Sequence, residues 1–176
     1  MAMIDDFKAN LIGGGARANQ FRVTITPPPG IAIGLDVRRT SFLVRSSNLP
    51  GMVMGEIPIA FRGRNIYIAG DRTFDEAWTT TFFNDTDFMI RNAMERWSNG
   101  INQHEANVGI ANPNDYMADM IVEQLDKEGK AVKRYDFRGT FPTNIGAIDL
   151  SYENENAIEE FTVELQVNYW ESNTTS

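Results

Sequence analysis

The chain has 176 residues, of which 42% are apolar and 23% charged, so it is long enough for one domain with a hydrophobic core. It contains no cysteine, which excludes disulfide frameworks, zinc–thiolate sites and thiol nucleophiles. The 24 Asp and Glu residues outnumber the 16 Lys and Arg residues and leave a formal net charge of −8, which argues against a protein whose main task is to grip nucleic acid by its phosphates.

The N-terminal segment combines a short helical pattern with a run of glycines. Ile4, Phe7, Leu11 and Ile12 follow a helical spacing, and three consecutive glycines end it. The segment is either a surface helix on a flexible hinge or an arm, residues 1–15, that docks on a neighbouring subunit. Acidic residues stand where a signal peptide carries positive charge, and no stretch has the roughly 20 apolar residues of a membrane helix. We therefore expect a protein without a membrane span, made in a cytoplasm.

Two short strands are predicted in the first quarter of the chain. Apolar and polar side chains alternate over Gln20–Thr26, which is typical of a half-buried strand, and three prolines and a glycine end it. A second strand is predicted over Ser41–Ser46, with Phe42 and Val44 on one face.

The next segment, Asn48–Gly55, is predicted to be a surface loop because it is rich in Pro, Gly and Met. Met52, Val53 and Met54 are apolar residues within this loop. Adaptable methionine side chains suit a contact surface. A local tuck of these side chains into the core explains their position equally well.

Strands and one helix are predicted in the middle of the chain. Strands over Glu56–Phe61 and Asn65–Ala69 flank a tight Arg-Gly-Arg turn, and a fifth strand covers Ala77–Phe83. The one long helical pattern covers Thr86–Ser98, with Thr86 as the expected N-cap and an Asn-Gly pair at the end.

The C-terminal half is predicted to be a loop followed by strands. Ile101–Tyr116 is the loop, and Ala118–Asp126 and Ala131–Gly139 form a β-hairpin around a glycine turn. Phe141–Gly146 is predicted to be another turn. A last strand covers Glu160–Tyr169, where apolar and polar side chains alternate without a break.

Seven or eight short strands and one or two helices predict a mainly β fold. We expect an antiparallel β-sandwich or barrel with a flanking α-helix. It should form a single domain over residues 1–176, with a flexible C-terminal tail over residues 172–176.

No pattern in the sequence indicates catalysis or a bound cofactor. His104 is the only histidine and lies in a predicted loop, and the GxSxG, P-loop and HExxH motifs are absent. Asp85 and Asp87 weakly resemble the start of a calcium loop, but no Gly or Glu follows at the required spacing. The sequence therefore predicts no catalytic residue, no cofactor and no metal site.

Three segments resemble a known family. They are GARANQFRVTI over Gly15–Ile25, IPIAFRGRNIYIAGDRTFD over Ile57–Asp75, and Gly139–Glu171, which contains FPTNIG and ends in EEFTVELQVNYWE. In this order and spacing they resemble the tail tube proteins of contractile-tailed bacteriophages, which are related to the tube proteins of pyocins and type VI secretion.

The resemblance implies a structural protein and not an enzyme. It implies two packed antiparallel sheets with a flanking helix, in subunits that form hexameric rings with a continuous inner β-barrel. The rings would stack into a hollow tube that conducts DNA into the host without binding it specifically. The implied partners are the contractile sheath, the tape measure protein, the baseplate tube initiator and the tail terminator, in a virion assembled in the host cytoplasm.

The resemblance also directs attention to two kinds of surface. The ring-stacking contact is expected at Met52, Val53 and Met54. The acidic balance suits a lumen that repels phosphates. The residues expected to face the lumen are Asp119, Glu123, Glu160 and Glu164, each of which can equally face the sheath or the solvent.

Three alternatives remain open at the level of sequence. The chain can be the tube subunit of a pyocin or a type VI-like contractile injection system. It can be a baseplate protein that nucleates the tube, although such proteins are usually longer. It can also be a monomeric β-sandwich that binds carbohydrate, which a line of surface aromatic residues would favour.

Overall fold

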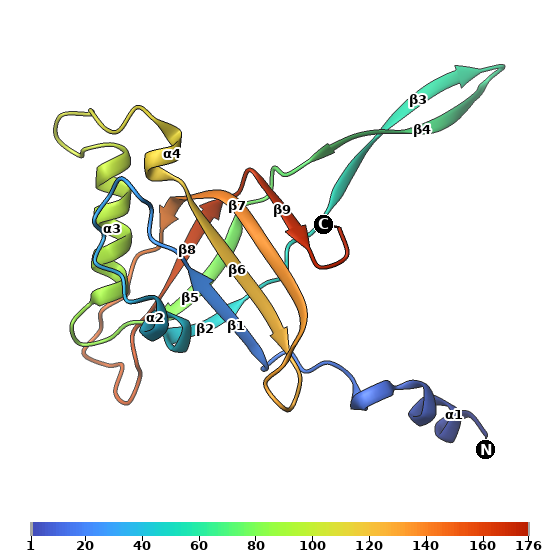
Figure 1. The fold of residues 1–176 in the computed structure, drawn as a ribbon, viewed down its shortest axis with the longest axis horizontal. Coiled ribbons are helices and arrows are strands. Elements are labelled where there is room, and N and C mark those ends of the chain that lie inside the picture. Colours follow the sequence, from blue (N-terminus) through green and yellow to red (C-terminus); the bar gives the residue numbers. More distant parts are fainter. Residues whose placement is uncertain (1, 176) are drawn as a thin grey trace.

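The computed structural model describes residues 2–175 and is mainly β (Figure 1). The helices are α1 (Ala2–Asn10), the short 3₁₀ helix η1 (Ile12–Gly14), α2 (Val37–Leu43), α3 (Met89–Ile101) and α4 (Pro113–Tyr116). The strands are β1 (Phe21–Ile25), β2 (Val44–Ser47), β3 (Val53–Phe61), β4 (Arg64–Thr73), β5 (Trp78–Phe83), β6 (Ala118–Leu125), β7 (Ala131–Ile145), β8 (Glu160–Gln166) and β9 (Tyr169–Ser172).

Seven strands form one antiparallel sheet that folds into two layers. The strand order is β1-β6-β7-β8-β5-β2, and β9 pairs with the N-terminal half of β7. The fifteen-residue strand β7 belongs to both layers, because it pairs with β6 and β9 up to Thr140 and with β8 from Phe141 onward. We call β1-β6-β7-β9 the first layer and β2-β5-β8-β7 the second layer.

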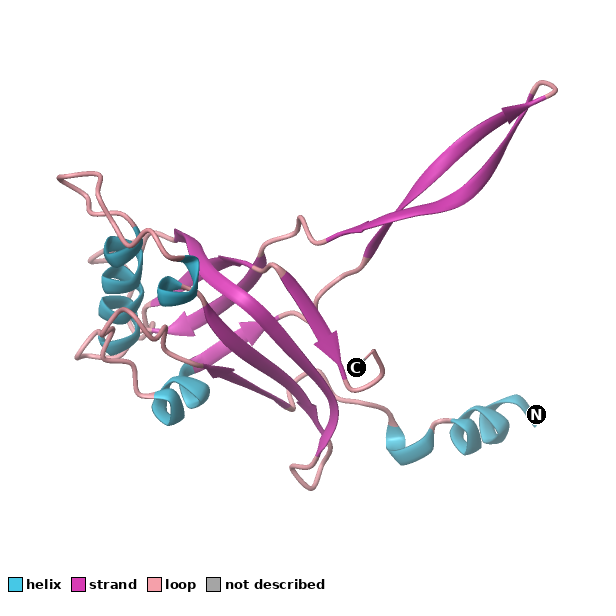
Figure 2. Ribbon diagram, turned by 45° about the horizontal axis from the view of Figure 1, so that its top comes forward, coloured by secondary structure: helices cyan, strands magenta, loops and turns pink. Residues whose placement is uncertain are grey.

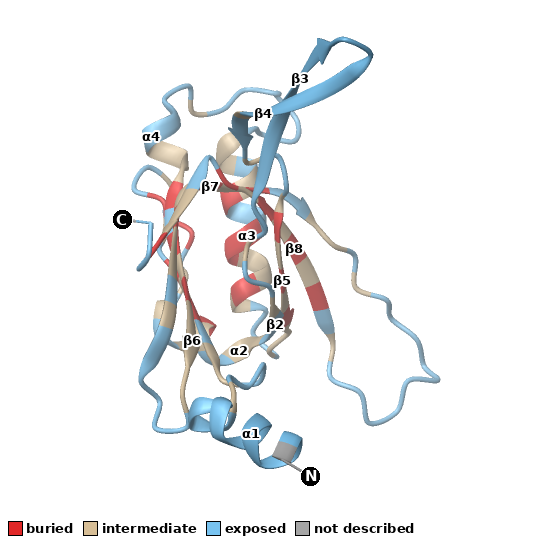
Figure 3. Cartoon of the chain, turned by 90° about the vertical axis from the view of Figure 1, so that its right-hand side faces the viewer, coloured by how far each residue is buried: buried red, intermediate tan, exposed pale blue. Residues whose placement is uncertain are grey.

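The core lies between the layers and against α3. Inward residues alternate along each strand, for example Val23 and Ile25 on β1 and Phe161, Val163 and Leu165 on β8. Figure 3 shows the buried side of α3 facing the space between the layers. Its core residues are Ile90, Ala93, Met94 and Trp97.

The predicted fold class is confirmed: the chain is an antiparallel β-sandwich with a flanking helix. Predicted strands are present at β1, β3, β4, β5, β6 and β8, and those at β1 and β8 were predicted from alternation. Alternation succeeds because a half-buried strand must place every second side chain in the core.

The strand predicted over Ser41–Ser46 was half wrong, because its first residues belong to α2. Asp36 caps this helix: its side chain accepts a hydrogen bond from the Arg39 backbone N–H at 3.1 Å. The Thr40 hydroxyl donates to the Asp36 carbonyl at 2.7 Å. Phe42 is therefore an exposed helical residue and does not share a strand face with Val44.

The turn predicted over Phe141–Gly146 was also wrong, because β7 continues to Ile145. Pro142 suggested a turn, since proline cannot donate to a strand ladder. The pairing between β6 and β7 stops at Thr140. At Pro142, β7 pairs with β8 alone, so no backbone N–H is needed on the side that faced β6. A register shift between Pro142 and Asn144 accommodates it.

Two helix and strand ends differ from prediction. The helix α3 begins at Met89 and not at Thr86: Phe88 has a left-handed backbone with φ of 53°, and the Asp87 carboxylate accepts from the Met89 N–H at 3.2 Å. The last predicted strand is interrupted after Gln166, so Tyr169 begins β9 and its side chain is exposed.

The two ends of the chain lie in different surroundings. The helix α1 projects away from the body (Figure 1). At the other end, the predicted tail starts inside β9, where Ser172 is buried and the Lys133 ammonium donates to the Thr174 hydroxyl at 2.7 Å. The predictions for Met1 and Ser176 concern positions outside the described residues.

Candidate functional site

The hairpin of β3 and β4 stands apart from the rest of the molecule (Figure 2). These two strands pair only with each other, and every residue in them except Gly70 is exposed. An isolated two-stranded hairpin is marginally stable in water. Within residues 2–175 this hairpin pairs with no other strand, so nearly all of its side-chain surface is open to solvent.

One face of the hairpin is apolar. Ile57 pairs with Ile68 and Ile59 pairs with Ile66, and paired residues of an antiparallel ladder share a face. We call these four residues the isoleucine face, and each is 44–52% exposed. Contiguous apolar surface on a soluble protein marks an interaction site.

The tip of the hairpin is basic. Arg62 and Gly63 form the two-residue turn with φ of 47° and 79°, as hairpin turns with both central residues at positive φ require. The Arg62 guanidinium lies over the Phe61 ring, 5.3 Å from its centroid. Among residues 2–175, neither Arg62 nor Arg64 forms a salt bridge.

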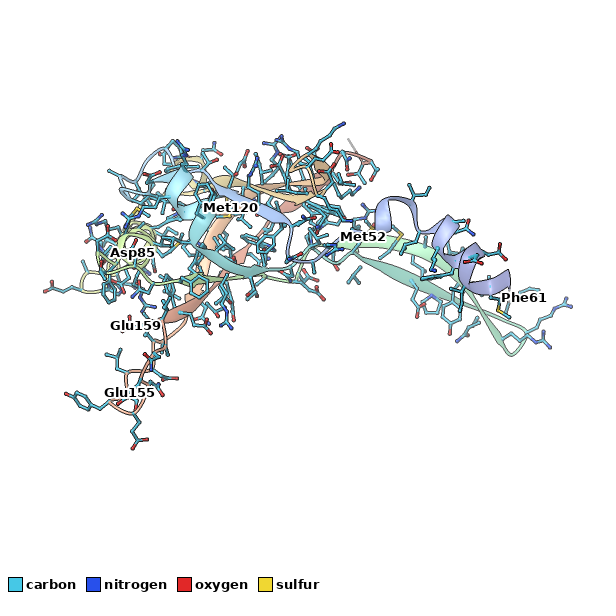
Figure 4. All side chains as sticks on the ribbon, turned by 90° about the horizontal axis from the view of Figure 1, so that it is seen from below. Met52, Phe61, Asp85, Met120, Glu155 and Glu159 are labelled. Carbon is cyan, nitrogen blue, oxygen red and sulfur yellow. The ribbon has the colours of Figure 1, made fainter. Side chains whose placement is uncertain are left out.

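The expected ring-stacking residues lie at the root of this hairpin. Val53 and Met54 were predicted to lie in a loop, which was wrong. They are the first residues of β3 and pair with Thr73 and Arg72. Met52 lies just before the strand, and all three are half-exposed. Figure 4 shows Met52 at the root and Phe61 near the tip. A register shift between Met54 and Glu56 lets β3 run through Gly55.

Two of the expected lumen carboxylates lie on the outer face of the first layer. Asp119 and Glu123 alternate with core residues of β6 and therefore point away from the core. Asp119 accepts from Arg138 at 2.5 Å, and this hydrogen bond raises the pKa of Arg138. Glu123 lies 3.6 Å from the guanidinium of Arg22. Arginines offset the negative charge of this face.

The other two carboxylates lie on the outer face of the second layer. Glu160 and Glu164 alternate with core residues of β8, and Glu160 forms a salt bridge with Arg45. Glu164 pairs across the ladder with Thr79 and forms no salt bridge within residues 2–175. The four carboxylates predicted to face the lumen thus lie on opposite outer faces of the sandwich, two on each. A lumen lined by one of these faces contains only two of the four.

The acidic pair that weakly resembled a calcium loop serves another purpose. Asp85 and Asp87 both form salt bridges with Arg39, which ties α2 to the segment before α3. The hydrogen bond from Arg39 lowers the pKa of Asp85 below 3.8. In the described part of the chain, no three His, Asp or Glu side chains gather as a metal site would require.

The helices within residues 2–175 are all too short or too polar to cross a membrane.

The fold is shared with proteins of contractile injection systems. A chain from the tube terminating cap of the anti-feeding prophage matches 92% of this chain over 91% of its own length, with a TM-score of 0.63 and 16% identity. A chain from the PVC sheath–tube complex in its extended state covers 94% of this chain and 95% of its own, with a TM-score of 0.61 and 11% identity.

Sequence comparison identifies the family. The family described as phage tail tube protein matches residues 16–173, and this chain belongs to it. It is 33% identical to the tail tube protein of Serratia phage KSP90 over 168 residues, which cover 94% of each protein. It is 32% identical to tail tube protein gp19 of Enterobacteria phage T4 over 160 residues, which cover 90% of this chain and 93% of gp19.

The isoleucine face was missed at the level of sequence. Its signal is present, since Ile57, Ile59, Ile66 and Ile68 alternate with other residues on both sides of a two-residue turn. The same alternation is typical of a strand that packs on a core. Only the tertiary structure separates the two situations.

Proposed function

We propose that this chain is the structural subunit of a bacteriophage tail tube and performs no catalysis. Its hexameric rings stack into a hollow tube, within a contractile sheath, that conducts DNA into the host. The observation that carries the proposal is the match to phage tail tube proteins over nearly the whole chain, together with an exposed apolar hairpin that a second subunit must cover.

Covering the hairpin supplies free energy for assembly. Burying one large aliphatic side chain from full exposure stabilises by about 1.5–3 kcal/mol, so each half-exposed isoleucine contributes about 1 kcal/mol. The four residues of the isoleucine face together contribute about 4 kcal/mol per subunit. Six subunits per ring repeat this gain, and the half-exposed side chains of Met52, Val53 and Met54 extend the same ring-stacking contact along the hairpin root.

The second layer is the one we place around the lumen. In the sequence the hairpin is inserted between β2 and β5, which are neighbours in this layer. The hairpin therefore extends the layer toward the next ring. Among the described strands, β2 pairs only with β5, and the C-terminal half of β7 pairs only with β8. Open edges on both sides of one layer let copies pair side by side into a closed barrel.

This placement assigns the two pairs of carboxylates to different walls. Glu160 and Glu164 face the lumen, beside the hydroxyls of Thr79, Thr81 and Thr162. Among the described residues of β2, β5, β8 and the C-terminal half of β7, the one cation is Arg45, which is paired with Glu160. A wall of these strands suits a conduit because each added phosphate contact would hold the DNA back. Asp119 and Glu123 lie on the opposite layer and face away from the lumen.

The proposed partners follow from the same role. The chain binds copies of itself, the sheath, the tape measure protein, the baseplate tube initiator and the tail terminator, in a virion assembled in the host cytoplasm. The fold match to a sheath–tube complex and to a tube terminating cap supports contacts with a sheath and a terminator.

A phage tail fits better than the alternatives. Identity is 32–33% to phage tail tube proteins and only 11–16% to the two injection-system chains. A carbohydrate-binding module would present aromatic rings in a line, whereas only two of the eight exposed large hydrophobic residues of this hairpin, Phe61 and Tyr67, are aromatic.

Assembly of the purified protein tests the proposal. Wild-type protein should form rings or tubes in negative-stain images, and Ile59→Lys with Ile66→Lys should abolish them, because each subunit then carries two charges on the apolar contact. Val132→Lys is the matched control, since Val132 is also exposed but lies on β7. A wild-type protein that stays monomeric at all salt and protein concentrations would refute the proposal.

A further inference from the structure

A cavity lies beside the root of the hairpin. Its volume is about 250 Å³, and its apolar lining includes Trp78, Phe137, Val167 and Trp170. The rings of Trp78 and Phe137 are 5.1 Å apart, and the Trp78 indole N–H is already satisfied by the Asn48 carbonyl at 2.9 Å. An apolar cavity of about 150 Å³ already accepts a benzene ring, so this one has room for a phenyl group.

The rim of this cavity is negative. Asp75 and Glu76 stand in the connection between β4 and β5 and line the cavity together with Gly51. Neither carboxylate forms a salt bridge with any residue in the range 2–175. An aromatic floor with an unpaired acidic rim fits a group that is apolar at its end and cationic beside it.

The hairpin tip has that chemistry. Phe61 is 56% exposed, and Arg62 and Arg64 flank it without an acidic residue in the turn. The tip cannot reach the cavity of its own chain, because the nine residues of β3 hold it about 30 Å from the root. Any contact between tip and cavity must therefore join two copies.

We propose that Phe61 at the hairpin tip of one subunit inserts into the cavity at the hairpin root of another, with Arg62 and Arg64 paired to Asp75 and Glu76. This inference rests on the proposed tube function and names one of its contacts. Tip and cavity are different surfaces present once on each copy. The contact is therefore heterologous and repeats without limit along an assembly, as a tube requires.

Charge favours the hairpin tip over the exposed apolar side chains of α1. Phe7 on α1 is also exposed, but it follows Asp5 and Asp6 directly. The carboxylates of Asp5 and Asp6 would be repelled by those of Asp75 and Glu76 at the cavity rim. The tip brings two cations to the same place.

Cysteine cross-linking tests this contact, and the cysteine-free chain gives a clean background. The variant Phe61→Cys with Val53→Cys places one thiol at the tip and one at the cavity lining. After mild oxidation of assembled protein, it should give a ladder of oligomers on a non-reducing gel, because a disulfide needs Cα atoms within about 7 Å. Phe61→Cys with Val132→Cys is the matched control and should give no ladder.

The outcomes separate this contact from the function on which it rests. Tubes that form without the ladder overturn the contact and leave the tube function standing. A ladder from Phe7→Cys with Val53→Cys, and none from Phe61→Cys with Val53→Cys, shows that α1 fills the cavity and also overturns it. Wild-type protein that forms no rings or tubes overturns both.

Charge reversal provides an independent test of the same contact. Arg62→Glu with Arg64→Glu, or Asp75→Arg with Glu76→Arg, should each raise the protein concentration needed for tube formation by about tenfold or more, because like charges then meet. Combining all four changes in one chain should restore assembly toward the wild-type concentration. Circular dichroism checks that each variant is folded. If folded variants of both kinds assemble like wild type, the contact is wrong.

Discussion

At the scale of single residues, the ion pairs of this protein tie segments together and do not form a reactive site. Arg39 on α2 bridges Asp85 and Asp87, which lie just before α3, and its guanidinium is 2.7 Å from the Asp87 carboxylate. This cluster joins a helix beside the first strand to the helix that closes the core. Its strength should depend on pH, because one carboxylate of the cluster titrates at a lowered pKa.

The first prediction concerns this pH dependence. The pKa of Asp85 is lowered below 3.8 when the protein is folded, chiefly by the hydrogen bond from Arg39. The stabilisation is therefore fully present above pH 3.8 and is lost as pH falls through the folded pKa. Arg39→Met should lower the urea midpoint of unfolding at neutral pH, and its difference from wild type should shrink in acid. Arg38→Met, on the same helix and without a salt bridge in the described chain, should leave the midpoint nearly unchanged at every pH.

A constant difference between Arg39→Met and wild type across this pH range would contradict the assignment. It would mean that Arg39 acts by packing of its aliphatic stem and not through the ionised Asp85.

At the scale of elements, β7 decides the architecture because it crosses from one layer to the other. Gly139 lies at the crossing, with a positive φ of 62°. A Cβ atom at this position would stand 2.4 Å from Nδ2 of Asn168, in the short link between β8 and β9. The strand therefore needs glycine here both for its backbone angle and for the close approach of its neighbour.

The second prediction follows from that position. Gly139→Ala should reduce the free energy of unfolding by about 1–2 kcal/mol, the usual cost of a left-handed backbone at a residue with a Cβ atom. Urea unfolding followed by tryptophan fluorescence measures the change. Adding Asn168→Ala to Gly139→Ala separates two causes of the lost stability. The part of the unfolding free energy that the second change restores was lost to the steric clash with Asn168. The part that stays lost comes from the backbone angle. An unchanged free energy of unfolding in Gly139→Ala would show that β7 crosses without constraint at this residue.

At the scale of the whole molecule, the two outer faces differ in the way that charge is arranged. The first layer carries Asp119 beside Arg138 and Glu123 near Arg22, so opposite charges are interleaved. The second layer is richer in hydroxyls, and its Glu164 has no cationic partner in the described residues. A wall of that kind lets a polyanion slide, whereas interleaved arginines offer it points of attachment.

The third prediction tests which face lines the lumen. Tubes assembled from Glu164→Lys in the presence of short labelled DNA should retain DNA that nuclease cannot digest, because six new cations per ring would face the enclosed phosphates. Retention should fall as salt rises. Asp119→Lys is the matched control. Its new cations would lie on the outside of the tube, so DNA bound there would remain accessible to nuclease. Protection by Asp119→Lys and none by Glu164→Lys would place the first layer around the lumen instead.

The sequence by itself determined the local elements and the family. Alternation identified β1 and β8, and the turn between Phe61 and Arg64 identified the hairpin, because strand faces and tight turns depend on neighbouring residues. Three motifs in fixed order predict the phage tail tube family, and the family match over residues 16–173 confirms it.

Only the tertiary structure decided which surfaces are available. The isoleucines of the hairpin alternate like those of a core strand, and nothing local reveals that no layer packs on them. Likewise, β6 and β8 both show polar outer faces, but their placement in opposite layers separates Asp119 and Glu123 from Glu160 and Glu164. The physical reason is that a strand pattern records which side of a strand is apolar, while the contacts between distant segments decide what that side meets.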